Sequence, residues 1–239
     1  TSFIVSYLHW GKPTISIFKH NDWILTHALK GANSTQKTLL VIERQALAAQ
    51  QLCKFFIQGH IQDNDDMFKK LPQQLNRQQF SDLFLALAFA IGNTEPLDEP
   101  LLTNSMRLWE LLKNLATEQR FEEEFAFSDA FSNWLAIESL PEEWRLETFT
   151  EIISTGDVNF KDLYGTLASL KTLSRSHPRE CLSLVFALLL KLRQRYDLAW
   201  SVHVIYEMLE GLPEQPNDPL GEMRNEVESQ LARIGYSRS

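Results

Sequence analysis

The segment from Leu182 to Leu192 restricts the fold more than any other part of the sequence, because nearly all of its positions are apolar. A helix on a protein surface needs one apolar stripe, whereas a helix that is apolar on all sides must be buried on all sides. Leucine and alanine, which dominate the segment, favour helix over strand. The run is shorter than the roughly 20 residues that a membrane-spanning helix needs. We therefore predict a central buried helix, with other helices packed around it, and no membrane span.

Apolar residues recur every three or four positions from about residue 43 onward, which is the period of amphipathic helices. Glycines, prolines and short polar stretches divide this region into helices joined by short loops, as in antiparallel helix pairs. One predicted helix carries an apolar stripe of Phe80, Leu83, Phe84, Leu87 and Ile91. Another is expected to begin with a cap at Asp157 or Asn159 and to carry Phe160, Leu163 and Tyr164. Trp109 and Trp144 lie 35 residues apart (144 − 109), close to the 34-residue period of tetratricopeptide (TPR) repeats. The residue pattern of those repeats does not recur from one pair to the next. We expect an irregular antiparallel helical array, with a TPR-like α-solenoid as the alternative.

The first 42 residues follow a different pattern. Residues 3–10 are rich in β-branched and aromatic side chains, and residues 14–18 alternate between apolar and polar, which is the period of a strand. Gly11 and Pro13 separate the two segments. We predict a small β-rich subdomain at residues 1–42 and an α-helical array domain at residues 43–239. The expected fold class is mainly α with a small N-terminal β element.

Composition and charge exclude some classes of function. Hydrophobic residues make up 44% of the 239 positions and charged residues 23%, as in ordinary soluble proteins. The net charge of −8 disfavours non-specific binding to nucleic acid, which depends on Lys and Arg. The two cysteines, Cys53 and Cys181, stand among apolar residues and are expected to be buried free thiols, as a reducing compartment allows. With no secretory signal pattern, we expect a cytoplasmic protein.

The acidic run Asp63–Asp66 was considered as a calcium site. An EF-hand loop that starts at Asp63 needs glycine at its sixth position and glutamate at its twelfth. The sequence has Phe68 and Gln74 there. We interpret the run as a solvated acidic loop that precedes a helix.

Histidines offer two further candidates. His9, His20 and His27 could ligate zinc if the predicted strands brought them together, but nothing in their spacing does so. His203 and Glu207 lie one helical turn apart and could act as an acid–base pair, although such pairs are usually solvated contacts. The sequence also contains none of the common nucleotide-binding, hydrolase or zinc-protease motifs. We therefore predict no catalytic residue, metal or cofactor, and we lean against an enzyme.

One basic stretch stands out, and it directly precedes the predicted buried helix. Its members are Lys171, Arg175, His177 and Arg179. The free N–H groups at the start of a helix favour anions, so a phosphate or an acidic segment of a partner could dock there. The alternative is a basic loop that offsets the charge of an acidic protein.

Helical arrays present grooves and extended faces that hold peptides or other proteins. The sequence therefore predicts a non-catalytic protein–protein interaction module, such as an adaptor, assembly or targeting subunit of a larger complex, whose partner is another protein. Two alternatives remain. One is a helical enzyme with a dispersed active site, which would need a deep pocket with converging ionisable groups. The other is a subunit of a nucleic-acid-associated complex, which would need a continuous basic stripe.

Overall fold

The chain divides into two units, Thr1–Ala48 and Ala49–Ser239. The computed structural model describes residues 49–50, 52–60, 75, 77–93, 97–118, 127–155, 158, 160, 162–192, 198–212 and 219–236. The β-rich subdomain predicted for residues 1–42 lies outside the described residues, and so does the predicted boundary after residue 42. Both remain predictions.

The described part of the chain is helical and contains no strand, which confirms the prediction of a mainly α protein. Its labelled helices are α5 (Arg77–Gly92), α6 (Glu99–Glu118), α7 (Phe127–Leu135), α8 (Glu142–Thr155), α9 (Leu163–Leu173), α10 (Pro178–Lys191), α12 (Val202–Glu210) and α13 (Pro219–Arg233). No helix in these ranges is long and apolar enough to cross a membrane.

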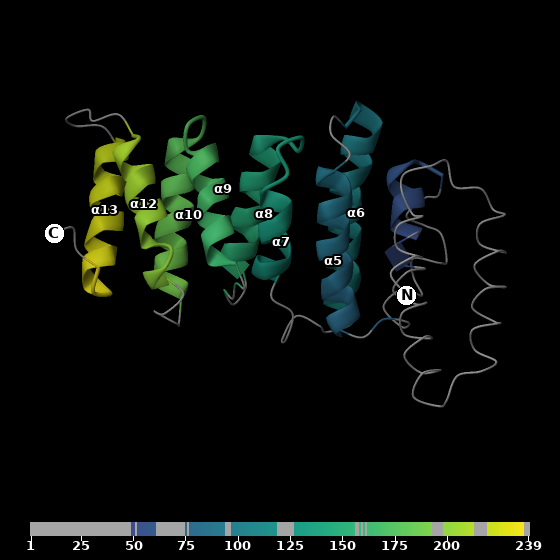
Figure 1. Cartoon of the computed structure of the whole chain (residues 1–239), viewed down its shortest axis with the longest axis horizontal. Helices are drawn as coiled ribbons and strands as arrows, with labels where there is room; N and C mark the ends of the chain where they lie inside the picture. Colours follow the sequence, from purple (N-terminus) through teal and green to yellow (C-terminus); the bar gives the residue numbers. More distant parts are fainter. Residues whose placement is uncertain are drawn as a thin grey trace. The chain divides into compact units, whose positions relative to one another are not determined.

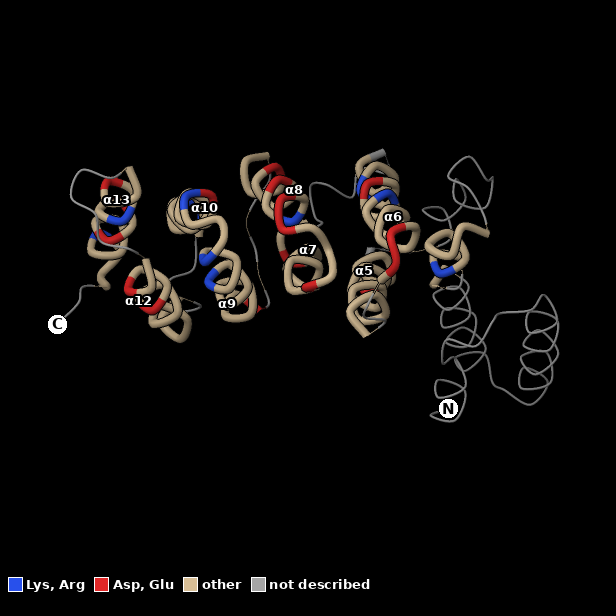
Figure 2. The backbone as a smooth tube through the Cα atoms, turned by 90° about the horizontal axis from the view of Figure 1, so that it is seen from above, with Lys and Arg blue, Asp and Glu red and all other residues tan. Residues whose placement is uncertain are grey.

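Within Ala49–Ser239 the helices form two layers (Figures 1 and 2). The first layer consists of α5, α7, α9 and α12, and each of these helices packs on the next. The second layer consists of α6, α8, α10 and α13, in which α10 packs on both α8 and α13. Contacts between α7 and α8 and between α9 and α10 join the layers. Consecutive labelled helices therefore alternate between the layers, and neighbours within a layer are separated in sequence by one other labelled helix.

A cluster of aromatic rings joins α5, α6 and α7. The indole ring of Trp109, on α6, is fully buried, and its centroid lies 4.8 Å from Phe84 and 4.7 Å from Phe131. Trp134 lies 5.3 Å away, and its Nε1 donates a 3.0 Å hydrogen bond to the carbonyl oxygen of Phe84. Edge-to-face ring pairs contribute about 0.5–1.5 kcal/mol each beyond the area they bury. Trp109 therefore forms the centre of a three-helix core.

The predicted central helix is α10, and it packs against α8, α9 and α13. Its buried residues are Cys181, Leu182, Leu184, Val185, Leu188 and Leu189. The prediction that this segment is a helix is confirmed, but the prediction that it is buried on all sides is wrong. Ser183 is exposed, and Leu190 retains 58% of its accessible surface. One side of α10 faces outward because its neighbours lie only on the other sides.

The start of α9 corrects a second expectation from the sequence. Asp157 or Asn159 was expected to cap this helix, with Phe160 inside it. Instead Asp162 is the cap, and its Oδ1 accepts a 2.8 Å hydrogen bond from the backbone N–H of Gly165. A Cβ atom at Gly165 would lie 2.4 Å from Asp162 Oδ2, so a larger residue there would force this carboxylate to shift from its capping position.

Two cations bind the C-terminal carbonyl groups of helices, which have no partner within the helix. Arg145, which is buried on α8, donates from Nη1 to the carbonyl oxygen of Leu135 at the end of α7, at 2.8 Å. Burial lowers the pKa of Arg145, and Glu142 and Glu138 oppose that effect. Lys191, at the end of α10, donates from Nζ to the carbonyl oxygens of Ile153 and Ser154 near the end of α8. Such bonds fix the ends of neighbouring helices relative to one another.

Both cysteines are buried and free, as the sequence predicts. Burial raises the pKa of the Cys53 thiol above its ordinary range and that of Cys181 to about 12. Neither thiol ionises near neutral pH, so both act as small apolar side chains.

Candidate protein-binding surface

The basic stretch predicted from the sequence spans the connection between α9 and α10. Lys171 lies in the last turn of α9, and Arg175 follows in the turn after that helix. His177 is the N-cap residue of α10, and Arg179 lies in its first turn. Because α9 belongs to the first layer and α10 to the second, the stretch begins in one layer and ends in the other.

Lys171 forms an ion pair across the first layer. Its Nζ donates a hydrogen bond to Oε2 of Glu207 on α12. This hydrogen bond, together with the charge of Lys171, lowers the pKa of Glu207, and the nearby His203 acts in the same direction. The Lys171–Glu207 ion pair joins α9 to α12. Lys171 therefore binds the carboxylate that the sequence suggested as the partner of His203 in an acid–base pair.

His177 points toward the second layer. Its Nε2 lies 3.1 Å from Oε2 of Glu142 at the start of α8, and its side chain makes no capping hydrogen bond to α10. Arg175 and Arg179 are exposed. The structure therefore engages two of the four basic residues with glutamates on two different helices. Binding of an anion or an acidic partner by the stretch remains a prediction.

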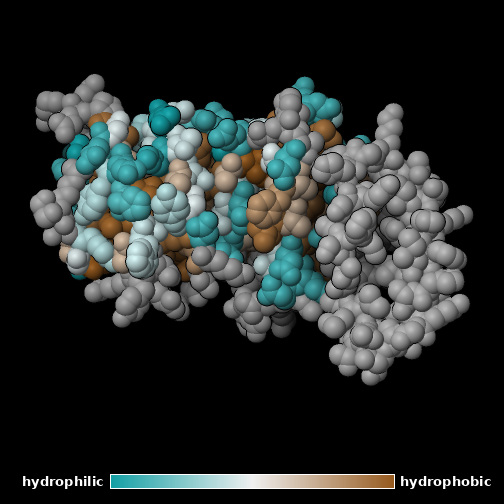
Figure 3. Space-filling view, viewed as in Figure 1, coloured by the Kyte–Doolittle hydropathy of each residue, from teal (hydrophilic) through white to brown (hydrophobic). Residues whose placement is uncertain are grey.

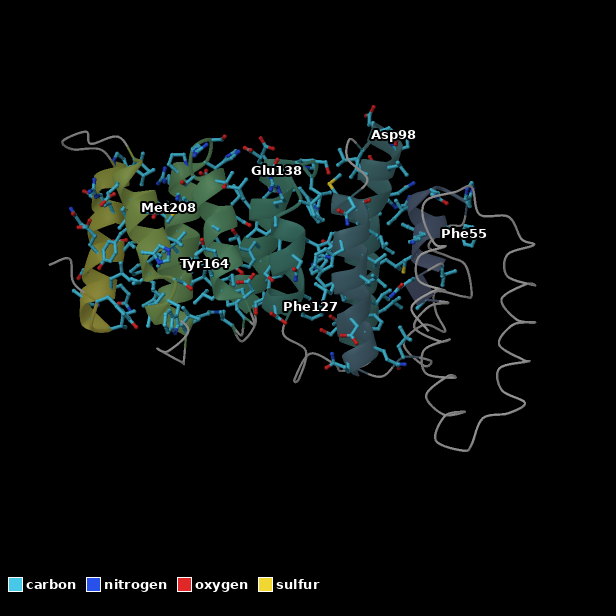
Figure 4. The ribbon with its side chains drawn as sticks, in the orientation of Figure 1. Phe55, Asp98, Phe127, Glu138, Tyr164 and Met208 are labelled. Atoms are coloured by element: carbon cyan, nitrogen blue, oxygen red, sulfur yellow. The ribbon has the colours of Figure 1, made fainter. Side chains whose placement is uncertain are left out.

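Aromatic side chains line the outer side of α9 and α12. Tyr164, at the start of α9, keeps 52% of its surface exposed, and its ring centroid lies 5.8 Å from that of His203 on α12 (Figure 4). Trp200 lies in the turn before α12 and is 84% exposed. An indole that is exposed to this degree gains nothing from the fold of the described residues, because its apolar area remains in water.

A second apolar area lies on α5. Leu85 and Phe89 are one turn apart on its exposed side, and Phe89 retains 61% of its accessible surface. Figure 3 shows apolar side chains gathered over α5, with hydrophilic residues above and below them. Leu85, Phe89 and Tyr164 lie on helices of the first layer, and Trp200 lies in the turn that leads into α12, a helix of the same layer. We refer to Leu85, Phe89, Tyr164 and Trp200 as the first-layer surface.

The first-layer surface contains residue types that are common in protein–protein interfaces. Trp and Tyr are enriched among the residues that dominate the energy of protein–protein interfaces, because they bury a large area with few rotatable bonds. The Lys171–Glu207 pair adds opposite charges on α9 and α12, the two helices that the Tyr164–His203 contact also joins. Within the described ranges, no three His, Cys, Asp or Glu side chains lie close enough together to hold a metal ion.

Sequence periodicity located the buried side of α5 but missed its exposed one. The predicted stripe comprises Phe80, Leu83, Phe84, Leu87 and Ile91, and each of these residues is buried, which confirms it. Phe89 lies off that stripe, and this position was the signal in the sequence that its side chain is exposed. Tyr164 was placed with the apolar residues of its helix, yet it is half exposed. Its neighbour Leu163 is buried, so the two adjacent residues of α9 face different surroundings.

The comparisons with known proteins add no family to this description. No protein-family model matches the chain, and no significant match was found among curated proteins or solved structures.

Proposed function

We propose that this chain is a non-catalytic protein–protein interaction module, which acts in the cytoplasm as an adaptor, assembly or targeting subunit of a larger complex. The observation that carries the proposal is the exposure of Phe89 on α5, Tyr164 on α9 and Trp200 in the turn before α12. Large apolar patches on soluble proteins commonly mark interaction sites. Covering these three side chains with a partner would bury apolar area that the fold leaves in water.

We further propose that the array is an irregular α-solenoid. Side-chain contacts between neighbouring helices of one layer recur at similar sequence separations, namely 38 residues for Lys113 and Glu151, 38 for Lys191 and Ile153, and 36 for Lys171 and Glu207. These separations correspond to one helix pair. A stack of helix pairs extends the surface available to a partner, which is how solenoid proteins bind extended segments. The first-layer surface would then be the face that the partner covers.

The two alternative functions remain hypotheses. An enzyme needs ionisable groups that converge on a pocket, and a nucleic-acid-binding subunit needs a continuous basic stripe. The contacts of Lys171 and His177 with glutamates engage two of the basic residues that such a stripe would use. No contact within the described ranges favours either alternative over protein binding.

Affinity capture with paired variants tests the proposal. The wild-type protein, the double variant Phe89→Asp/Trp200→Asp and the control Leu190→Asp would be used to capture proteins from lysate of the natural host. Leu190 is as exposed as Phe89 but lies on α10, in the second layer. We expect a partner in stoichiometric amount with the wild type and with Leu190→Asp. The double variant should retain at least about tenfold less of it, as for interface residues of this type.

Two results would contradict the proposal. One is a wild-type protein that captures no stoichiometric partner. The other is equal loss of the partner with Leu190→Asp and with the double variant, because the first-layer surface would then have no special role. All three substituted side chains are exposed, so we expect the variants to keep the wild-type circular dichroism spectrum. An unchanged spectrum excludes unfolding as the cause of a loss of partner.

A further inference from the structure

We infer that a groove between α8 and α10, in the second layer, is a separate docking site for a basic amphipathic helix of a partner protein. This site is independent of the first-layer surface, and it would give the module a second partner segment.

The groove follows the length of α8. One wall is the side of α8 from Glu143 to Ser154, and the other is the start of α10 with His177 and Glu180. Its volume is about 460 Å³. The two helices run side by side in the same direction, because their starts meet at the His177–Glu142 contact and Lys191, at the end of α10, binds carbonyl groups at the end of α8. From Glu143 to Ser154 the groove spans about 16 Å, or roughly three helical turns.

Carboxylates line the rim of the groove. Glu143, Glu147 and Glu151 follow one another at intervals of four residues, about 6 Å apart along α8. Glu180 lies on the opposite wall. Glu151 is bound by Lys113 of α6, whereas Glu143, Glu147 and Glu180 make no ion pair within the part of the chain that the structure describes.

This arrangement of charge is unfavourable for the isolated chain. Like charges four residues apart on a helix repel one another. A partner with Lys or Arg at the same one-turn spacing would remove that repulsion and form ion pairs on both walls. The net charge of −8 would also draw a basic segment toward the protein. Charge complementarity therefore selects a cationic occupant.

Between its carboxylates the groove also offers some apolar surface, which selects an amphipathic occupant. Leu146 lies at the floor and is buried, and Thr150 follows one turn later. A helix whose middle row is leucine would pack on this floor, while the alkyl stems of its lysines would cover the walls and carry their ammonium groups to the carboxylates. Two parallel helices already form a seam of helical length, and an amphipathic helix binds in such a groove through its i, i+3, i+4 and i+7 residues.

The same rim weighs against an anion at the start of α10. An anion that approached His177 would meet Glu142, Glu143 and Glu180. Their negative charge opposes the attraction of the helix N-terminus, which is a partial charge of about half a unit. The groove therefore favours a basic helix over the phosphate or acidic segment expected from the sequence alone.

A designed peptide is the probe for this site. It would be a fluorescently labelled amphipathic helix of about three to four turns, with lysines at one-turn spacing beside a row of leucines. Fluorescence anisotropy would measure its affinity for the full chain and for the variant Glu143→Gln/Glu147→Gln/Glu180→Gln. The matched control, Glu99→Gln/Glu222→Gln/Glu226→Gln, changes the net charge by the same amount at exposed positions on α6 and α13.

We expect the groove variant to bind the peptide at least about tenfold more weakly than the wild type, as for the loss of several exposed ion pairs. The control variant should keep the affinity within about twofold, because distant exposed charges are screened by salt. Thr150→Trp fills the groove without a change of charge, and it should also lower the affinity about tenfold or more. A peptide with the same residues in scrambled order should bind as weakly as the groove variant does.

Three outcomes would overturn the inference: equal loss in the groove and control variants, wild-type affinity in Thr150→Trp, or equal affinity for the scrambled peptide. Each would show attraction by net charge without a defined site. The variant Phe89→Asp/Trp200→Asp should bind the peptide as the wild type does. The experiments can therefore contradict the proposal for the first-layer surface and the proposal for this groove separately.

Discussion

The helices α5, α6 and α7 are held together differently from the helices α8 to α13. In the first region, rings from three helices meet around a single indole, that of Trp109. In the second region, the core residues of α10 are aliphatic and spread along the helix, where they meet α8, α9 and α13. The second region also contains polar links between neighbours within a layer, such as Lys171–Glu207 and Lys191 with the end of α8.

The difference shows two ways to stabilise a stack of helices. A ring cluster concentrates packing at one point, so its loss affects three helices at once. Aliphatic side chains spread the packing over several turns, and the loss of one leaves the others in contact. Links between helix ends then set the register of neighbours. If this comparison is correct, the loss in the free energy of unfolding should be largest when the centre of the ring cluster is removed. It should be smaller when one aliphatic core residue is removed, and smallest when one surface ion pair is removed.

The largest effect is expected from Trp109→Ala. The substitution removes the ring that contacts Phe84, Phe131 and Trp134, and it leaves a cavity among large rigid side chains that cannot easily close it. We expect the free energy of unfolding to fall by about 3–5 kcal/mol. Urea denaturation followed by far-UV circular dichroism measures this change.

Trp109→Phe serves as the matched control. It keeps a ring in the cluster, and it removes an indole N–H that has no hydrogen-bond partner within the described part of the chain. The loss of stability should be clearly smaller than for Trp109→Ala. Equal losses in the two variants would show that the cluster does not depend on its central ring.

The next effect is expected from Leu188→Ala on α10. Leu188 is 1% exposed and lies on α10, whose buried residues are mainly aliphatic and which packs against α8, α9 and α13. Such side chains can move into part of the cavity, so we expect a loss of about 2–3 kcal/mol, in the lower part of the range for Leu→Ala. The same urea titration applies. A loss as large as that of Trp109→Ala would remove the distinction between the two regions.

The sequence predicted which segments are helical and which side of α5 is buried. It could do so because helix period and apolar residue type are local properties, as the stripe from Phe80 to Ile91 illustrates. Local patterns also gave the buried state of Cys53 and Cys181. The prediction of the α9 cap failed because several polar residues precede the helix. Only packing decides which of them accepts a hydrogen bond from the free N–H of Gly165.

The candidate sites depended on packing that no local pattern contains. Leu190 was expected to be buried, yet α10 has neighbours on only some of its sides. The partner of Lys171 is Glu207, which lies 36 residues away in the sequence. The partner of His177 is Glu142, which lies on α8 in the second layer. The groove between α8 and α10 brings Glu143 and Glu180 to opposite walls, although no pattern in the sequence links them. Sequence reasoning identified the basic residues but not the carboxylates that would meet them.

The smallest effect on stability is expected from removal of the Lys171–Glu207 ion pair between α9 and α12. This effect is best measured through the pKa of Glu207. In the folded chain Lys171 lowers the pKa of Glu207 below its ordinary value of 4.5. The pair therefore adds stability above that ordinary value, and this contribution is lost as the pH falls through the lowered pKa of the folded state. In Lys171→Met the pKa of Glu207, measured by NMR titration of its side-chain carboxyl carbon, should return toward the ordinary value. At neutral pH the stability should change little, because exposed ion pairs contribute little. An unchanged pKa in the variant would mean that Lys171 does not hold Glu207 in solution, and the packing of α9 on α12, which includes the Tyr164–His203 ring contact, would then join these two helices without this ion pair.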